Sequence, residues 1–266
     1  MLRVLKYVVL LYIVLCGLYY SYQHLLYFQP QKLDVNHALT FPMRIRFKET
    51  KMAFDANTII DVVRFEPEID TPKGVVLFFH GNRYNVEHYS TYAPYFTKLG
   101  YECWMPDYPG YGRSTGEISV KGLEEISIQL YKMARAKYAS DSIIVYGKSL
   151  GSGVAAYLAS RRDCKMLMME TPYYSLEALT REYLFMMPVS WLLRENIATN
   201  EYLPQVAAPI MVWHGTHDEL IPISESAKLI PLMKPTDKFY VMPGADHNSV
   251  PASGVFAASI DSALSH

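Results

Sequence analysis

The chain has 266 residues, of which 50% are hydrophobic and 19% charged, and its 25 Lys and Arg nearly balance 26 Asp and Glu to leave a net charge of -1. A protein that neutralises many phosphates needs clustered basic residues, so this composition excludes a nucleic-acid-binding role. The apolar content, with 22 Tyr, 11 Phe and 3 Trp, also excludes a disordered chain. We therefore expect a folded protein with a sizeable core.

The N-terminal residues differ from the rest of the chain. Residues 7–20 contain neither a charged side chain nor an amide side chain. A helix over residues 7–28 would span about 33 Å, enough for a hydrocarbon core of about 30 Å. Bulky residues such as Tyr19, Tyr20 and Tyr22 stand where a signal peptidase would need small ones, which favours an uncleaved anchor. A removed signal peptide and a buried helix of a soluble protein are the alternatives.

The basic residues near the start predict the orientation of this anchor. Arg3 and Lys6 precede the span, so we expect the N-terminus on the cytoplasmic side and the remainder on the extracytoplasmic side of a single-pass membrane protein. We assign residues 1–28 to the anchor and residues 29–266 to one domain of ordinary size. Residues 29–36 are the expected tether between the two.

The domain alternates short apolar runs with amphipathic helices, the pattern of an α/β fold. Five continuous apolar runs predict parallel strands that are buried on both faces. They are residues 75–79, 143–146, 166–169, 210–213 and 239–242, with a weaker sixth run at 101–105. Residues 43–47 and 59–65 alternate like strands with no helix between them, which predicts an antiparallel lead-in to a doubly wound, mostly parallel sheet. A helix is expected over residues 122–139.

A glycine–x–serine–x–glycine motif directly follows the apolar run at residues 143–146. Ser149 stands between Gly147 and Gly151, and small residues continue into a predicted helix. Such a serine occupies a sharp strand-to-helix turn, where small residues two places away on either side let strand and helix approach closely. The glycine–lysine–serine triplet also resembles the end of a phosphate-binding loop. That motif requires glycine where Ser142 stands, so nucleotide binding is disfavoured.

A serine hydroxyl becomes an effective nucleophile when a neutral imidazole accepts its proton and a carboxylate orients that imidazole. Asp218 and His247 each follow a predicted strand, and both come after Ser149 in the chain. Serine, then aspartate, then histidine is the order expected for a nucleophile on this kind of turn. Glu170, at the end of an earlier strand, is the alternative acid.

Catalysis by such a serine also requires donors for the negative charge that develops on the substrate oxygen. We expect the backbone N–H of Leu150 to be one donor and that of Asn82, after the first apolar run, to be the second. His80 is expected to brace this turn through hydrogen bonds. The remaining histidines lack metal-ligand spacing, so we expect neither a metal nor a cofactor.

These motifs together resemble the α/β-hydrolase superfamily over about residues 41–266. They are His80-Gly81-Asn82, the Gly- and Pro-rich segment 107–114, Gly147 to Gly151, residues 215–218 and His247. The sequence looks most like membrane-anchored serine hydrolases of the serine-aminopeptidase-like and lysophospholipase-like group. That resemblance implies Ser149, Asp218 and His247 as a catalytic triad. Such relatives include esterases, thioesterases and peptidases, so the resemblance does not choose the substrate.

Some 40 residues separate the apolar run at 166–169 from the run at 210–213, more than one crossover needs. We expect residues 171–206 to form a small helical cap, with one helix stopped by Pro188. Bulky residues of this segment are candidates for an acyl pocket, although plain packing is the alternative. The candidates are Tyr174, Phe185, Met186 and Trp191.

The sequence therefore predicts a membrane-tethered serine hydrolase that cleaves esters or thioesters of apolar acyl groups through an acyl-enzyme. Its expected partners are a small-molecule or lipid-like acyl substrate and the membrane, with no nucleic acid, and its oligomeric state stays open. A serine peptidase is the first alternative, and it would need carboxylates such as Glu177, Glu182 or Glu195 to hold a substrate amine. A non-catalytic interaction module that kept the fold is the second.

Overall fold

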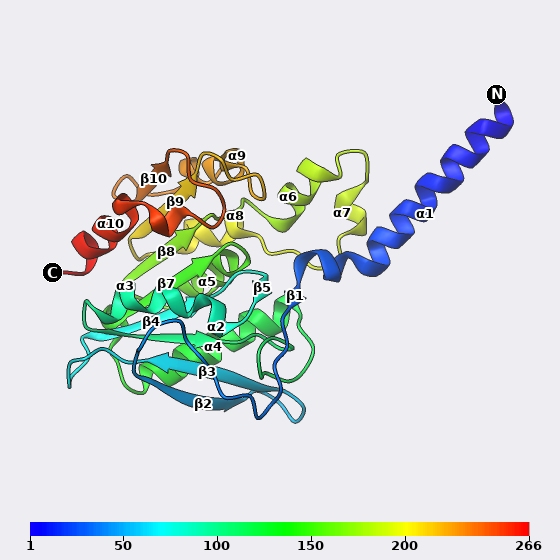
Figure 1. Cartoon of the computed structure of the whole chain (residues 1–266). Coiled ribbons are helices and arrows are strands. Elements are labelled where there is room, and N and C mark those ends of the chain that lie inside the picture. Colours follow the sequence, from blue (N-terminus) through cyan, green and yellow to red (C-terminus); the bar gives the residue numbers. More distant parts are fainter. Residues whose placement is uncertain (266) are drawn as a thin grey trace.

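An eight-stranded sheet forms the centre of the domain, in the order β10-β9-β8-β7-β4-β6-β3-β2 (Figure 1). The computed structural model describes residues 1–265. The strands are β2 (Phe47–Ala53), β3 (Ile59–Phe65), β4 (Gly74–Phe79), β6 (Tyr101–Pro106), β7 (Ile143–Lys148), β8 (Met166–Glu170), β9 (Ile210–Gly215) and β10 (Lys238–Met242). Strands β10 through β6 in that order are parallel, whereas β3 pairs antiparallel with both β6 and β2. The predicted α/β class and the antiparallel lead-in are confirmed.

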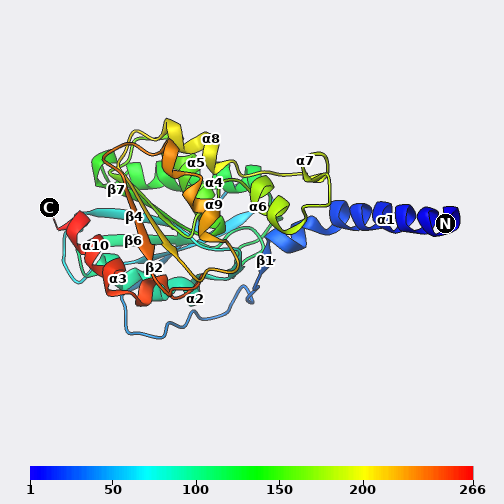
Figure 2. The same cartoon turned by 90° about the horizontal axis from the view of Figure 1, so that it is seen from above.

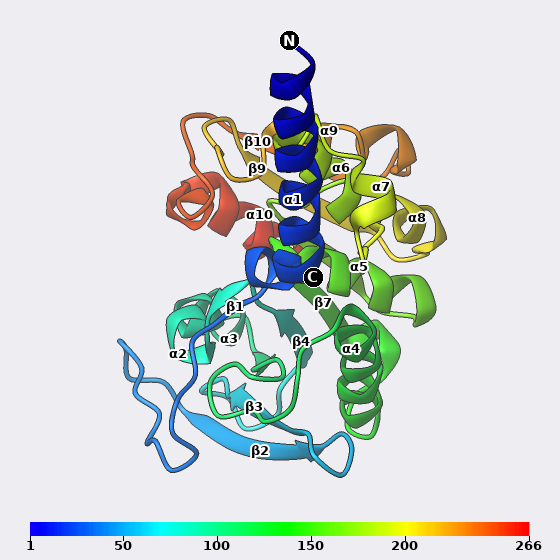
Figure 3. The ribbon, with the colours of Figure 1, turned by 90° about the vertical axis from the view of Figure 1, so that its right-hand side faces the viewer.

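Helices cover both faces of the sheet. Figures 2 and 3 show α4 and α5 on one face and α2, α3 and α10 on the other. The helices of the domain are α2 (Val86–Tyr89), α3 (Ala93–Thr97), α4 (Val120–Arg135), α5 (Leu150–Arg161), α6 (Leu176–Tyr183), α7 (Val189–Leu192), α8 (Thr199–Tyr202), α9 (Ile223–Ala227) and α10 (Gly254–Leu264). Helices α6, α7 and α8 lie between β8 and β9 in the chain, in the segment where the sequence predicts a cap.

The core is divided by the sheet into two layers, because successive side chains of a strand point to opposite faces. On β4, Val75 and Leu77 belong to the apolar cluster that includes residues of α4 and α5. Val76 and Phe78 belong to the second cluster, with residues of α3 and α10. All residues of β4, β6, β7 and β9 are buried, as the continuous apolar runs predict.

The strands at both edges of the sheet differ from their predictions. The first strand is β2, Phe47–Ala53, and not residues 43–47; among its residues only Met52 is buried. Strand β10 occupies the predicted place but only Met242 is buried, so it is not covered on both faces. An edge strand has a single neighbour and more contact with water. Burial therefore imposes a weaker apolar pattern on its sequence.

Helix α1 (Leu2–Tyr27) extends away from the domain (Figures 1 and 2). Its 26 residues include an 18-residue window with a mean hydropathy of 1.9 that is 6% buried. By length and composition this helix can cross a membrane, a test that a signal sequence also passes.

The segment after α1 is not the free tether that the sequence predicts. Strand β1 (Gln29–Pro30) pairs with β5 (Arg83–Tyr84), immediately after the turn that contains His80. The backbone of Lys32 also pairs with that of Gly112 in an isolated parallel β-bridge. Strand pairing satisfies the backbone groups of this segment and joins the end of α1 to the edge of the candidate site.

Candidate active site

Ser149 lies at a strained turn between β7 and α5. Its φ of 52° and ψ of -121° place a non-glycine residue at positive φ. A Cβ at Gly147 would lie 2.2 Å from the carbonyl oxygen of Gly151, and a Cβ at Gly151 would lie 2.1 Å from that of Phe79. Both positions therefore require glycine so that β7, β4 and α5 can approach one another at the serine.

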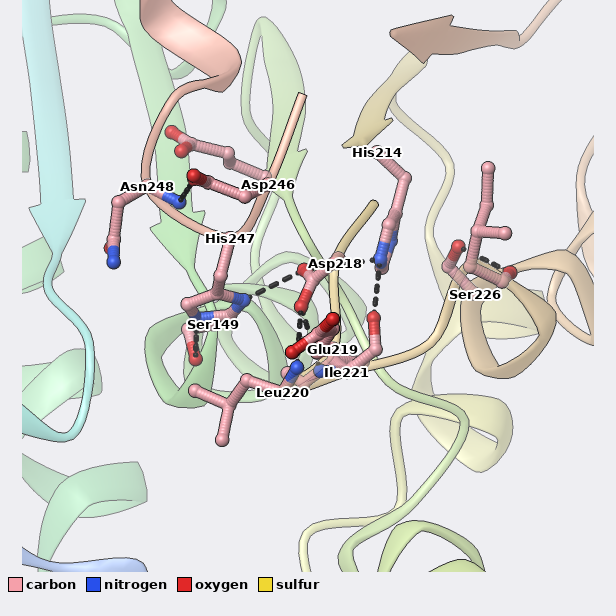
Figure 4. Close-up of polar contacts among 12 residues, drawn as sticks. Ser149, His214, Asp218, Glu219, Leu220, Ile221, Ser226, Asp246, His247 and Asn248 are labelled. Atoms are coloured by element: carbon pink, nitrogen blue, oxygen red, sulfur yellow. Dashed lines mark hydrogen bonds and ion pairs between the residues drawn. The ribbon is translucent and has the colours of Figure 1, made fainter. Parts of the chain in front are cut away.

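The structure brings Ser149, His247 and Asp218 into one hydrogen-bonded chain (Figure 4). His247 Nε2 lies 3.0 Å from Ser149 Oγ, and His247 Nδ1 lies 2.7 Å from Asp218 Oδ2. When Nδ1–H donates to the carboxylate, Nε2 is left to accept the serine proton. Residues from the ends of β7, β9 and β10 thus meet in the geometry that activates a serine hydroxyl.

Asp218 is held ionised by its surroundings. Its Oδ1 accepts hydrogen bonds from the amides of Leu220 and Ile221 at 3.0 and 2.8 Å. His214 Nε2 lies 3.3 Å from Oδ2. Burial by itself raises the pKa of this carboxyl, but the hydrogen bonds from His214 and His247 outweigh it and hold the pKa below its usual range.

His214 is a site residue to which sequence reasoning assigned no role. It lies near the end of β9, the strand that precedes Asp218, and its side chain is fully buried. Its Nε2 also lies 2.7 Å from the carbonyl oxygen of Ile221, so it links the carboxylate to the loop that carries it. The only sign of this role in the sequence is that His214 stands at a strand end, four residues before Asp218.

Glu170, the alternative acid, contacts Lys148 and not His247. Lys148 Nζ donates to Glu170 Oε1 at 2.6 Å, and both side chains are buried. The same carboxylate accepts hydrogen bonds from the hydroxyls of Tyr92 and Tyr146. Of the two acidic residues that the sequence left open, Asp218 is therefore the one that contacts His247.

Lys148 is a second residue to which sequence reasoning assigned no role at the site. Its Nζ donates to the backbone carbonyl oxygen of His247 at 2.8 Å. The ion pair with Glu170 thereby connects β7 and β8 to the loop that carries the imidazole. The signal in the sequence was a lysine directly before Ser149, which sequence reasoning considered only as part of a phosphate-binding loop.

The turn after β4 lies against Ser149, with His80 bracing it as predicted. His80 is fully buried, its Nδ1 lies 2.7 Å from the carbonyl oxygen of Gly81, and its ring stacks on Tyr108 at 4.0 Å between centroids. Burial lowers the pKa of His80 to about 4 and raises that of Asp107, 3.7 Å away, to about 8. Burial thus favours the neutral form of both side chains, which act as packing and hydrogen-bonding groups.

An apolar cavity of 360 Å³ lies beside Ser149. Its walls include the end of α1, helix α6 and the loop after β9, together with the turn after β4 and the start of α5. The lining residues are Leu26, Tyr27, Asn82, Ser149, Leu150, Tyr173, Leu176, Leu179, Thr180, Tyr183, Leu184, Leu220 and Ile221. Asn82 and Leu150, the expected oxyanion donors, both border this cavity. No charged side chain is among these lining residues.

The cavity beside Ser149 is lined by residues other than the four candidates for an acyl pocket. Tyr174, Phe185, Met186 and Trp191 do not line the cavity beside Ser149. Helix α6 ends at Tyr183, about one turn before the predicted stop at Pro188, so residues beyond Leu184 do not continue the helix face that lines the cavity. Phe185, Met186 and Trp191 are 79%, 73% and 87% exposed. Hydrophobicity alone could not separate these residues from those of the same segment that line this cavity.

No group of three or more His, Cys, Asp or Glu side chains among residues 1–265 is placed to hold a metal ion. The residues around Ser149 supply a nucleophile, a base and an apolar cavity. Such an arrangement is suited to acyl transfer from an apolar substrate.

Comparisons with known proteins agree with this geometry. The family described as serine aminopeptidase S33 matches residues 70–198. A Pyrococcus furiosus esterase of known structure superposes with a TM-score of 0.69 at 18% identity, covering 89% of this chain and 97% of the esterase. The chain therefore has the α/β-hydrolase fold.

Two curated proteins that are similar to this chain come from animals. Lysophosphatidylserine lipase ABHD12 of Mus musculus is 24% identical over 204 residues, covering 67% of this chain and 50% of the relative. The alpha/beta hydrolase domain-containing protein aho-3 of Caenorhabditis elegans is 28% identical over 179 residues, covering 66% of this chain and 52% of the relative. The chain therefore spans about half the length of these relatives, while the likeness to the Pyrococcus esterase establishes the fold.

Proposed function

We propose that this hydrolase cleaves carboxylic ester or thioester bonds of apolar acyl groups through an acyl-enzyme on Ser149. His247 Nε2 removes the proton from Ser149 Oγ as the oxygen attacks the acyl carbonyl, and it then protonates the departing alcohol or thiol. Asp218 stabilises the imidazolium that forms between these steps. A water molecule, deprotonated by His247, then attacks the acyl-enzyme and releases the carboxylic acid. The observation that carries this proposal is the hydrogen-bonded Ser149–His247–Asp218 chain at a strained turn.

The amides of Leu150 and Asn82 are the proposed donors to the oxyanion. Leu150 is the first residue of α5, so its N–H belongs to a helix N-terminus, where backbone donors and the helix dipole favour negative charge. Asn82 follows Gly81, at which an added Cβ would lie 3.6 Å from the Cβ of Ser149. Both residues border the cavity beside Ser149, Asn82 from the turn after β4 and Leu150 from α5.

The cavity supports a lipid-like acyl substrate. Its volume of 360 Å³ lies within the range of about 300–1,000 Å³ typical of ligand pockets, and its lining is dominated by leucine and tyrosine. The similar mouse protein is named a lysophosphatidylserine lipase and the similar Pyrococcus protein an esterase, which supports the same class of reaction.

The proposed arrangement is a membrane anchor over residues 1–28, a hydrolase domain over 29–266 and a cap over 171–206, with the N-terminus cytoplasmic. An anchor that stays attached fits the cavity better than a cleaved signal peptide, since Leu26 and Tyr27 of α1 form part of the wall. Tyr27 also shares a hydrogen bond of 2.6 Å with Thr180 of α6. Removing α1 would open the cavity to water.

Peptide hydrolysis is the second candidate, because the matching family is described as a serine aminopeptidase. An aminopeptidase needs a carboxylate to hold the substrate amine, and the three candidates lie elsewhere. Glu177 pairs with Arg181 at 2.7 Å, and Glu195 accepts from the amide of Val120 at 3.1 Å. Neither of these nor Glu182 lines the cavity, which favours an ester over a peptide substrate.

The test uses the full chain in detergent micelles and a fluorophosphonate probe. We expect the wild type to be labelled and Ser149→Ala to remain unlabelled. Ser160→Ala, a serine variant on the same helix α5, is the matched control and should be labelled like the wild type. Labelling that persists in Ser149→Ala would contradict the proposed nucleophile.

A substrate panel then identifies the bond that is cleaved. We expect p-nitrophenyl esters to be hydrolysed, with kcat/KM rising with acyl length, and aminoacyl anilides to be inert. Leu179→Trp should shorten the preferred acyl chain by filling the cavity, whereas the volume-conserving Leu179→Met should leave it unchanged. Faster cleavage of anilides than of esters would favour the peptidase.

A further inference from the structure

The connection between α6 and α7 presents an unusually apolar surface. Residues 183–193 contain no charged side chain, whereas Arg181 and Glu182 precede this run and Arg194 and Glu195 follow it. We call residues 184–193, which include α7, the α6–α7 loop. Phe185, Met186 and Trp191 of this loop are 79%, 73% and 87% exposed. Large apolar side chains gathered on one exposed segment mark an interaction surface.

The α6–α7 loop lies beside α1 (Figures 1 and 3). Near its tip, the Tyr12 hydroxyl donates to the carbonyl oxygen of Met186 at 2.9 Å. At its base, Gln23 Nε2 donates to the carbonyl oxygen of Leu192 at 2.9 Å. The 11 residues from Tyr12 to Gln23 correspond to about 16 Å along the helix. That length is roughly half of a hydrocarbon core of about 30 Å, or one leaflet.

Several backbone groups of the loop are hydrogen-bonded within the protein. The amides of Met187, Val189 and Leu193 donate to carbonyl oxygens within the loop. The carbonyl oxygens of Met186 and Leu192 are bonded by α1, as described above. A segment that enters hydrocarbon must satisfy its backbone polar groups within the protein, and these contacts satisfy several of them.

The ends of the loop suit the membrane–water interface. The Arg194 guanidinium lies 5.7 Å from the ring centroid of Tyr20 on α1. The backbone amide of Arg194 donates to Gln23 Oε1 at 2.9 Å. Tyrosine and arginine are side chains that anchor membrane proteins at the level of the lipid headgroups. The charged residues are thus gathered at the base of the loop, and the apolar ones project from it.

We propose that the α6–α7 loop inserts into the lipid bilayer beside α1, to a depth of about one leaflet. This inference rests on the proposed function, in which α1 anchors the hydrolase in a membrane. Its consequence concerns substrate access. Leu184 belongs both to the loop and to the wall of the cavity, and Leu26 of α1 lies on the same wall. A lipid acyl chain therefore enters the cavity from the bilayer, between α1 and the loop, and not from water.

Tryptophan fluorescence tests the insertion directly. Trp104 and Trp213 are buried, so Trp191 is the tryptophan that lipid can reach. The full chain is reconstituted in phosphatidylcholine vesicles with and without bromine atoms on the acyl chains. We expect brominated lipid to abolish most of the Trp191 emission, and the residual emission of Trp191→Phe to be unaffected. Equal quenching of wild type and Trp191→Phe would overturn the proposal.

A second variant reports the depth of the tip. In Trp191→Phe combined with Phe185→Trp, the tryptophan stands next to Met186, whose carbonyl oxygen lies at the level of Tyr12. Bromines near the bilayer centre should quench it more than bromines near the headgroups. The reverse order would show that the tip remains at the surface and would overturn the proposed depth.

Hydrolysis separates membrane docking from chemistry. A triple variant, Phe185→Ser with Met186→Ser and Trp191→Ser, should hydrolyse a water-soluble acetate ester at the wild-type rate. Its rate on a long-chain ester embedded in vesicles should fall about tenfold or more, because the loss of three apolar side chains weakens insertion. Val241→Ser with Val255→Ser removes exposed apolar side chains from β10 and α10 and should change neither rate. An unchanged vesicle rate in the triple variant would contradict entry from the bilayer.

The two proposals can fail separately. Quenching of Trp191 without hydrolysis of any ester would support the docking loop and reject the proposed function. Hydrolysis that requires Ser149, with no quenching of Trp191, would support the function and reject the docking loop.

Discussion

Lys148 is predicted to position His247 through the main chain, a role distinct from its ion pair. Its Nζ donates both to Glu170 Oε1 at 2.6 Å and to the carbonyl oxygen of His247 at 2.8 Å, and the side chain is buried. Lys148→Met keeps an unbranched apolar stem but removes both hydrogen bonds. The substitution should therefore lower stability and activity for two separable reasons.

The two magnitudes follow from the two contacts. Removing one partner of a buried ion pair costs about 3–5 kcal/mol, because the Glu170 charge is left without a counter-ion. Releasing the loop that carries His247 affects the chemistry, since a displacement of about 1 Å at a catalytic group costs about 10²-fold in rate. We therefore expect kcat for a short ester to fall about 10- to 100-fold in Lys148→Met, with KM little changed.

The matched variant is Lys148→Met combined with Glu170→Gln. It removes the uncompensated charge, so the free energy of unfolding should recover to within about 1–2 kcal/mol of the wild type. The carbonyl oxygen of His247 still lacks its donor, so kcat should remain low. Thermal unfolding and steady-state ester hydrolysis measure the two quantities. Recovery of kcat together with stability would refute the positioning role and leave Lys148 as a counter-ion only.

Three further predictions concern the turn and the buried groups around Ser149. Asp218→Asn should lower kcat by about 10⁴-fold, because the amide favours the wrong tautomer of His247, and an ester assay on folded protein checks this. Gly151→Ala should destabilise the fold by several kcal/mol, since its Cβ would lie 2.1 Å from the carbonyl oxygen of Phe79; a thermal melt within 1 °C of wild type would contradict the close approach. Because burial lowers the pKa of His80 from 6.5 to about 4, the unfolded chain takes up this proton first as pH falls. The stability that neutral His80 contributes is thus complete above pH 6.5 and is lost toward pH 4, by up to about 3 kcal/mol. His80→Asn should lose this pH dependence, measured as the difference between the two unfolding curves from pH 7 to 4.5.

Sequence reasoning was most effective where chemistry is local. The Gly147–Gly151 motif, with Ser149 at its centre, places the serine at the end of a buried strand without reference to any distant residue. Asp218 and His247 could be nominated in the same way, since each follows an apolar run at a strand end. The alternative acid, Glu170, stands at an equivalent strand end, and no local pattern ranks it against Asp218.

The partners of these residues depend on packing between segments distant in the sequence. The choice of Asp218 over Glu170 rests on which carboxylate contacts the imidazole of His247. Asp218 does so, whereas Glu170 accepts a hydrogen bond from Lys148. Edge strand β2 was misplaced for a related reason, because contact with water on one face removes the apolar periodicity that burial imposes elsewhere.

By itself, the sequence determined the α/β class, the serine turn and the apolar character of the N-terminal helix, because each of these follows from side chains adjacent in the chain. Only the tertiary structure decided which apolar residues line the cavity. Phe185 and Leu184 are neighbours of similar hydrophobicity, yet Leu184 lines the cavity and Phe185 is exposed beside α1. Their separation depends on the end of α6 and the course of α1, which are set by packing across more than a hundred residues of chain.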